Sequence, residues 1–188
     1  MSHPLPPKPA KLVVGVLAGD RALLAELSAR LAGRFGPPDL VSQWFPFGYT
    51  AYYEPEMGAP LWRRVLAFTG LIAQDGLAQI KLETNALEQD YRVGGRRRVN
   101  IDPGYLLLER FVLATGKNFS HRIYIGYGIY ADLTLLYRRG GFHPLPWTYP
   151  DYADAPLLGF LQRVRRKYVA DLAAAAGRAG GGAAPDHD

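Results

Sequence analysis

The first half of the chain alternates between apolar runs of strand length and segments whose apolar residues recur at helical spacing. Residues 11–18 form a β-branched run, and Asp20 then stands as an N-cap before a leucine-rich helical pattern. Gly-Pro-Pro at 36–38 ends that helix, and residues 40–47 and 61–68 are expected to be extended. This order predicts a strand, a helix and two further strands.

A second helix is predicted to begin with Asp75 as its cap, and residues 96–101 are expected to return as a strand. The helix carries Lys81, Asn85 and Glu88 along its flank. Its apolar face consists of Leu77, Ile80, Thr84, Leu87 and Tyr91. The repeated order strand–helix–strand predicts an α+β fold of the ferredoxin-like kind, a split β-α-β antiparallel sheet with helices on one face.

The clearest β pattern in the chain is interrupted at residues 126–128 by Gly-Tyr-Gly, a turn typical of hairpins. A turn centred there places Arg122 opposite Asp132 and Tyr124 opposite Tyr130. The other, apolar face of this added hairpin then consists of Ile123, Ile125, Ile129, Ala131, Leu133 and Leu135. One face is predicted to build core and the other to be polar and aromatic.

A proline-rich stretch at residues 143–152 follows the hairpin and leads into a C-terminal helix that is expected to end near Ala170. We therefore expect a flexible N-terminal segment over residues 1–10 and a single α+β domain over residues 11–170. An Ala/Gly-rich tail over residues 171–188 is expected to be disordered, because it has little to bury.

Composition narrows the functional classes. The 188 residues suffice for one buried core, and the absence of cysteine excludes disulfides, thiolate nucleophiles and Cys-ligated metal centres. The chain start lacks the apolar centre of a signal peptide, and no run of about 18 apolar residues occurs, so we expect a cytoplasmic protein without a membrane segment. The net charge of +5 favours anionic partners modestly. The oligomeric state stays open.

Several short strings distributed over Lys11 to Tyr168 carry a resemblance to a known family. They are Phe45-Pro-Phe, Tyr52-Tyr53-Glu54 with Glu56-Met57-Gly58, Val99-Asn-Ile-Asp-Pro-Gly-Tyr105, Phe119-Ser-His-Arg-Ile-Tyr124, Gly128-Ile-Tyr130 and Pro144-Leu-Pro-Trp-Thr-Tyr-Pro-Asp-Tyr152. Together they resemble the bacterial family known as domain of unknown function 4416 (DUF4416). The resemblance implies a shared fold, and it implies no activity, ligand or catalytic residue.

The most suggestive polar residues join the strand near position 100 to the start of the hairpin. They are Arg98, Asn100, Asp102, Lys117, Ser120, His121 and Arg122. Guanidinium groups bind phosphate oxygens bidentately and a lysine adds a point charge. We therefore predict that the polar face of the sheet binds a phosphorylated small molecule or nucleotide. Tyr124 and Tyr130 share this face and complete the predicted ligand-binding set.

Within this set, His121 and Asp102 are the candidate catalytic residues, an acid–base pair for phosphoryl transfer or hydrolysis. Strict alternation turns His121 away from Arg122 unless His121 lies just before regular pairing begins. The alternative is that His121 ends a strand and bonds backbone while Arg122 and Asp132 form a cross-strand ion pair. Whether the chain is an enzyme therefore stays open.

No spacing typical of zinc ligands occurs, and Mg²⁺ held by a bound phosphate stays open because it leaves little sequence trace. Two other functions also stay open. A non-catalytic RNA-binding module would use Tyr124 and Tyr130 as a stacking platform, whereas a protein–protein adaptor would use the Pro-aromatic segments. The basic runs at 96–98 and 163–167 are either a nucleic-acid footprint or solvated charge.

Overall fold

The structure is a computed structural model that describes residues 3–180. Its strands are β1 (Ala10–Ala18), β2 (Pro38–Val41), β3 (Phe45–Phe47), β4 (Leu61–Ile72), β5 (Val99–Leu106), β6 (Arg110–Thr115), β7 (Arg122–Gly126), β8 (Ile129–Arg138) and β9 (Gly141–Pro144). Its helices are α1 (Arg21–Phe35), α2 (Glu54–Met57), α3 (Leu77–Asp90) and α4 (Ala155–Gly180), with short 3₁₀ helices η1 (Gln74–Gly76) and η2 (Pro150–Ala153). The fold is thus mixed, with a helix at its C-terminal end.

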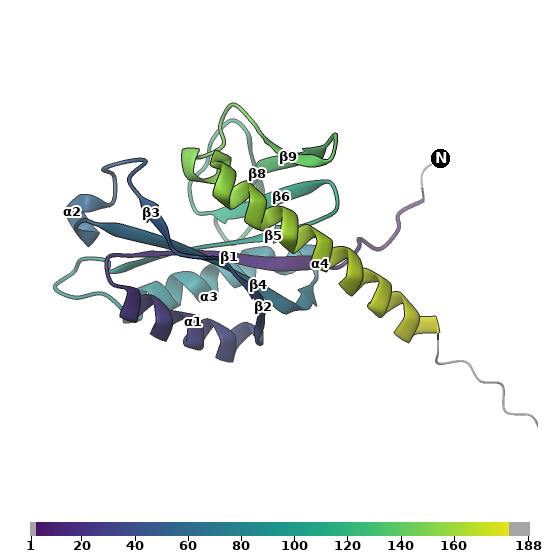
Figure 1. Ribbon diagram of the computed structural model, residues 1–188, viewed down its shortest axis with the longest axis horizontal. Helices are drawn as coiled ribbons and strands as arrows, with labels where there is room; N and C mark the ends of the chain where they lie inside the picture. Colours follow the sequence, from purple (N-terminus) through teal and green to yellow (C-terminus); the bar gives the residue numbers. More distant parts are fainter. Residues whose placement is uncertain (1–2, 181–188) are drawn as a thin grey trace, which may run out of the picture.

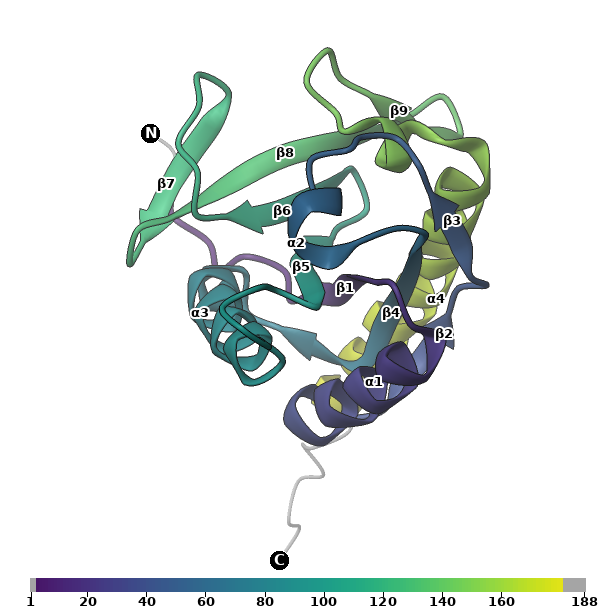
Figure 2. The same cartoon turned by 90° about the vertical axis from the view of Figure 1, so that its left-hand side faces the viewer.

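All strands of the described chain join one antiparallel sheet in the order β2-β4-β1-β5-β6-β8-β7, with β3 paired to β4 and β9 to β8. Strand β1 lies near the middle and is buried along its whole length. Its residues Leu12, Val14 and Val16 pack with α1 and α3, whereas Val13 packs in the core that includes α4. Figure 1 shows α1 and α3 on one side of β1 and α4 on the other, and Figure 2 shows the sheet curling towards β7.

The predictions for the first helix are confirmed, whereas the segment after it is divided. The Asp20 side chain accepts a hydrogen bond from Ala22 N at 2.8 Å, and the predicted leucines of α1 are buried. Residues 40–47 form two short strands, β2 and β3, instead of one extended segment. Between them the Ser42 hydroxyl accepts a hydrogen bond from Val65 N at 2.9 Å, so a side chain replaces one backbone partner of β4.

The orientation of α3 differs from the prediction. Asp75 lies in η1 and does not cap the helix, whose N-cap is Gly76. Lys81 and Glu88 are buried instead of flanking the core: Lys81 Nζ donates to Ile101 O at 2.8 Å, and Glu88 Oε1 accepts from Ile101 N at 2.6 Å. Strand β6 pairs with β5 only from Gly104 onwards, which leaves these backbone groups of Ile101 to side chains from α3.

The predicted hairpin is confirmed in its pairing but not in its burial. Strands β7 and β8 place Arg122 opposite Asp132 and Tyr124 opposite Tyr130. Ile123 on the predicted core face is largely exposed, because β7 is the edge strand of the sheet. Asp132 on the predicted open face is buried. The working surface predicted for this hairpin is therefore covered where β8 crosses the molecule.

Helix α4 is ten residues longer than predicted, since it continues from Ala170 to Gly180. The predicted disorder is thus wrong for residues 171–180, whose Ala-rich composition has high helix propensity. Residues 181–188 and residues 1–2 lie outside the described part of the chain. No helix between residues 3 and 180 is long and apolar enough to cross a membrane.

A buried lysine connects the extended part of α4 to the sheet. The Lys11 ammonium on β1 is fully buried and lies 2.5 Å from Asp39 Oδ2 and 2.7 Å from Asp171 Oδ2. Lys167 bonds Asp171 from the preceding turn of α4 and reaches Asp39 as well. Burial raises the pKa of Asp171, but hydrogen bonds from Lys11 and Lys167 outweigh it and hold the pKa below its usual value. Four charges thus tie α4 to β1 and to the segment after α1.

We expect Asp171→Ala to lower the free energy of unfolding by about 1–3 kcal/mol, because it leaves a buried ammonium with one carboxylate fewer. Chemical denaturation of both proteins measures this change. Because the folded pKa of Asp171 is lowered, the difference should be complete at neutral pH and should shrink as the pH falls below about 4. Glu109→Ala, at an exposed pair with Arg110, should change stability by less than about 1 kcal/mol. Equal effects of the two substitutions would contradict this account of α4.

Candidate functional site

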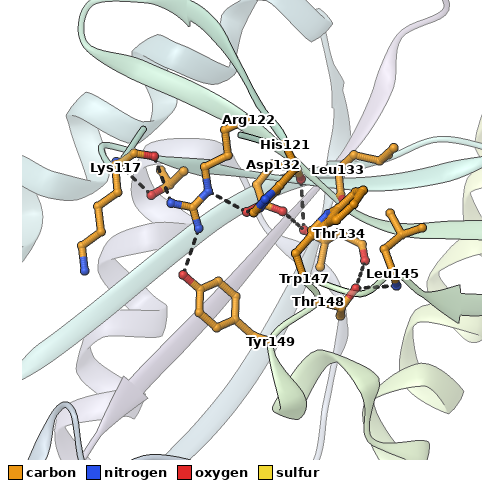
Figure 3. Close-up of polar contacts among 11 residues, drawn as sticks. Lys117, His121, Arg122, Asp132, Leu133, Thr134, Leu145, Trp147, Thr148 and Tyr149 are labelled. Atoms are coloured by element: carbon orange, nitrogen blue, oxygen red, sulfur yellow. Dashed lines mark hydrogen bonds and ion pairs between the residues drawn. The ribbon is translucent and has the colours of Figure 1, made fainter. Parts of the chain in front are cut away.

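The structure joins His121 and Arg122 to Asp132, and not to Asp102 (Figure 3). His121 Nε2 lies 3.2 Å from Asp132 Oδ2, and Arg122 Nε donates to the same oxygen at 2.9 Å. His121 therefore lies on the same side as Arg122, because β7 begins only at Arg122 and strict alternation has not started. The cross-strand ion pair considered as the alternative exists, and the predicted acid–base pair of His121 with Asp102 is not formed.

The His121 ring is also part of an aromatic stack. It lies parallel to Trp147 with ring centroids 4.7 Å apart, and Phe119 packs on it at 5.4 Å. Trp147 is itself held in place, because its indole Nε1 donates to Leu133 O at 2.8 Å. The segment that follows β9 is thereby placed over β8, as Figure 3 shows.

A second set of hydrogen bonds fixes the same segment. The Thr148 hydroxyl donates to Thr134 O at 2.5 Å and accepts from Leu145 N at 2.8 Å. Thr134 in turn donates to the backbone oxygen of Asp132 at 3.0 Å. These contacts account for the burial of Asp132 and Thr134, and they leave no open polar face at this part of the hairpin.

Arg122 makes two further hydrogen bonds within the protein. Nη1 donates to Lys117 O at 2.9 Å and Nη2 donates to Tyr149 OH at 3.0 Å. Burial lowers the pKa of Arg122, but the hydrogen bonds to Asp132 and Tyr149 outweigh it and raise the pKa. The guanidinium thus connects three segments of the chain, whereas the sequence suggested an anion clamp.

Asp102 belongs to a different centre, around the buried guanidinium of Arg63. Asp102 Oδ2 accepts from Asn100 Nδ2 at 2.9 Å and from Arg63 Nη1 at 3.2 Å. Arg63 Nε lies 2.8 Å from Asp151 Oδ2, and Arg63 Nη1 donates to Tyr152 OH at 3.3 Å. One arginine from β4 therefore joins β5 to η2.

Burial and charge act in opposite directions at this centre. Burial lowers the pKa of Arg63, but Tyr152, Asp151 and Asp102 outweigh it, so the pKa is raised. Burial raises the pKa of Asp151 against the attraction of Arg63. The pKa values of Tyr53 and Tyr152 are raised, first by burial and also by the neighbouring carboxylates. Both phenols thus keep their protons at neutral pH, and the Tyr152 hydroxyl accepts a hydrogen bond from Arg63.

Arg63 was not predicted as a functional residue from the sequence. The signal for it is an arginine that shares strand parity with Leu61 and Val65 inside an apolar run, which points its side chain inwards. A buried arginine requires carboxylate partners. Asp151 and Tyr152 were identified only as members of a proline-aromatic string, because their approach to β4 depends on the tertiary fold.

Arg98 belongs to neither the Asp132 centre nor the Arg63 centre, and it lines an open cavity of about 430 Å³. The cavity is lined by Gly19, Asp20, Leu23, Glu56, Met57, Gly58, Val93, Arg96, Arg97 and Arg98, and we refer to it as the arginine cavity. Arg97 stands between this cavity and the Asp102 centre: its Nε donates to Glu56 Oε2 at 2.6 Å, and its Nη1 donates to Asn100 Oδ1 at 3.5 Å.

The other predicted ligand residues lie at the surface. Lys117 Nζ donates to Tyr52 OH at 3.0 Å, which lowers the pKa of Tyr52. Ser120 is exposed in the turn before β7. Tyr124 is exposed and packs edge-on against Tyr130, with ring centroids 5.4 Å apart. The predicted residues are thus divided among several places. Within residues 3–180 no three His, Asp or Glu side chains gather so that they could hold a metal ion.

The model of the family described as "Domain of unknown function (DUF4416)" matches residues 8–168. The chain belongs to this family. The resemblance noted in the short strings is thereby confirmed. In this DUF4416 chain, the strings supply most side chains of the Arg63 and Asp132 centres, although they include neither Arg63 nor Asp132. No curated protein and no solved structure matches the chain.

Asp132→Ala should lower the free energy of unfolding by about 3 kcal/mol, because Arg122 would keep its buried charge without a carboxylate. Denaturant unfolding measures this loss. Asp90→Ala removes an exposed pair with Arg30 in this DUF4416 chain and should cost less than about 1 kcal/mol. A loss no larger than that of Asp90→Ala would show that Asp132 does not organise the centre.

A pair of glycine substitutions tests the close approach of β1 to the Arg63 centre. A Cβ at Gly15 would lie 2.6 Å from Tyr152 OH and 2.8 Å from Arg63 Nη1, so Gly15→Ala should destabilise the fold by about 1–3 kcal/mol. Gly33 in α1 has open space around it, and Gly33→Ala should stabilise by about 0.5–1 kcal/mol. Thermal unfolding of both variants measures the two effects. Opposite signs are expected, and a neutral Gly15→Ala would refute the packing.

Proposed function

We propose that this protein binds a phosphorylated small molecule or nucleotide, with the phosphate in the arginine cavity. The observation that carries the proposal is that three consecutive arginines, Arg96, Arg97 and Arg98, line one cavity of about 430 Å³. This volume falls within the range of small-molecule sites, roughly 300–1,000 Å³. Guanidinium groups match the geometry of phosphate oxygens.

The three arginines differ in what already holds them. Arg97 is fixed by Glu56 of α2 and by Asn100, so it forms a rigid wall. Arg96 and Arg98 are exposed, and among the described residues neither side chain has an ion pair. Their guanidinium groups therefore have free donors for a phosphate, so both Arg96 and Arg98 are suited to a direct contact.

The start of α1 adds to this electrostatic support. Gly19, Asp20 and Leu23 line the cavity, and α1 begins at Arg21. The first amide groups of a helix lack partners within the helix, and its dipole places partial positive charge there. The Asp20 side chain takes up one amide, that of Ala22, and Glu56 is already paired with Arg97. The lining therefore keeps a surplus of positive charge.

We infer that β1, α1, β2, β4, α3 and β5 form a split β-α-β unit of the ferredoxin-like kind. The support is that β4 lies between β1 and β2, while β1 lies between β4 and β5, with every neighbouring pair antiparallel. Ala18 at the end of β1 pairs with Val99 at the start of β5. This arrangement brings the loop before α1 and the arginines before β5 to one end of the sheet, beside the cavity.

The proposed activity is binding, in a cytoplasmic protein. Acid–base chemistry by His121 and Asp102 is not part of the proposal, because each has a different set of partners. The absence of cysteine is in keeping with a reducing compartment.

A ligand panel tests this function. Inorganic phosphate, pyrophosphate, sugar phosphates and nucleotides are added to the protein, and the Tm is measured by differential scanning fluorimetry. At least one should raise the Tm, because a ligand that binds only the folded state stabilises it in proportion to its occupancy. Arg98→Ala should reduce or abolish the shift.

Arg166→Ala provides a matched control, since it removes one exposed positive charge from α4 and leaves the cavity unchanged. It should keep the full shift. If no compound in the panel changes the Tm, or if the two variants lose the shift equally, the arginine cavity is not the phosphate site.

A further inference from the structure

Four exposed aromatic side chains gather near the Asp132 centre and are not used by the proposed phosphate site. The exposed fractions are 56% for Tyr52, 64% for Phe119, 38% for Trp147 and 49% for Tyr149. We refer to these four residues as the aromatic surface. Large aromatic rings are usually buried, so their collection at one place on the surface indicates an interaction site.

Side-chain contacts connect these rings to one another through His121, Arg122 and Lys117. Phe119 and Trp147 both pack on the ring of His121, with centroid distances of 5.4 Å and 4.7 Å. Arg122 bonds both the backbone of Lys117 and the hydroxyl of Tyr149. Lys117 in turn bonds the hydroxyl of Tyr52 and lies 4.5 Å from the centre of its ring.

Lys117 brings a positive charge to this surface. Lys117 is exposed, and no carboxylate of the described residues pairs with it. Its ammonium has three donors, of which Tyr52 takes one. The nearest acid of the Asp132 centre is only 4% exposed and is neutralised by Arg122. Anionic groups can therefore approach the rings without meeting an exposed carboxylate of that centre.

We propose that the aromatic surface binds single-stranded nucleic acid, with bases stacked on its rings and a phosphate at Lys117. Base stacking on aromatic side chains combined with cationic contacts to the backbone is the usual chemistry of single-strand binding. The proposal goes beyond the phosphate site, and it uses different residues. It also replaces the platform of Tyr124 and Tyr130 expected from the sequence.

The surface is built before any ligand arrives. Trp147 is held by Leu133 O and by the stack with His121, and Tyr149 is held by Arg122. Rings that are already fixed lose little conformational freedom on binding, which favours affinity. The positive net charge of the chain also favours a polyanionic partner over an uncharged one.

The experiment measures binding of fluorescently labelled single-stranded RNA and DNA of about ten nucleotides by anisotropy, over a series of salt concentrations. Phe119→Ala should weaken binding at least about five-fold, because it removes a stacking ring without changing charge. Lys117→Ala should weaken binding and reduce the slope of log K against log salt by about 0.7. Comparison of the RNA and DNA arms shows which strand is preferred.

Two substitutions on α4 serve as controls. Val169→Ala removes an exposed apolar side chain and Arg166→Ala an exposed charge, and both should leave the affinity unchanged. Phe119→Ala should also keep the Tm shift caused by the phosphate panel, and Arg98→Ala should lose that shift. The two proposals can therefore fail separately.

Circular dichroism verifies that each variant is folded. Absence of binding to both strands at low salt would overturn the proposal, as would equal affinity of the folded Phe119→Ala protein. Competition by heparin as strong as that by unlabelled single strands would also overturn it, because heparin has charge but no bases.

Discussion

The guanidinium of Arg63 joins parts of the chain that the sequence keeps far apart. It lies buried between Asp102 of β5 and Asp151 of η2 and reaches the hydroxyl of Tyr152. A buried charge without partners would cost several kcal/mol, so β4, β5 and η2 have to meet at this point. Gly15 permits the meeting, because a side chain at position 15 of β1 would collide with the arginine and the tyrosine.

The Asp132 centre also pairs buried charges, on the part of the sheet formed by β7 and β8. One carboxylate is shared by His121 and Arg122, and the ring of His121 supports Trp147. In both centres the buried charges have partners, so these residues build the scaffold. Among the described residues, no carboxylate pairs with Arg96 and Arg98 beside the cavity or with Lys117 beside the aromatic surface, so their remaining donors are available to a ligand. The buried polar residues thus hold the fold together, whereas the exposed polar residues near them are the ones proposed to bind a ligand.

Much of the local structure could be predicted from the sequence. Helix α1 follows from its cap at Asp20 and from its leucines, and the register of β7 with β8 follows from the glycine-flanked turn at Tyr127. Predictions that depended on contacts with residues distant in the sequence were less successful. Lys81 and Glu88 are charged residues of the kind that usually face solvent on a helix. They are buried because they form hydrogen bonds with the backbone oxygen and nitrogen of Ile101. The end of α4 was missed because Asp171 gains its role only beside Lys11.

The sequence by itself determined β1, β4 and the hairpin of β7 and β8 with its register, the helices α1, α3 and α4, and the family, because each depends on short-range periodicity, turn chemistry or short strings of residues. It also indicated which residue types could bind an anion. It did not predict β6, β9 or α2. Only the tertiary structure decided that His121 pairs with Asp132, that Asp102 pairs with Arg63, and that Arg98 faces a separate cavity. The physical reason is that a buried charge takes the partner that the folded sheet brings to it. That choice depends on contacts between residues separated by up to 160 positions along the chain, as for Lys11 and Asp171.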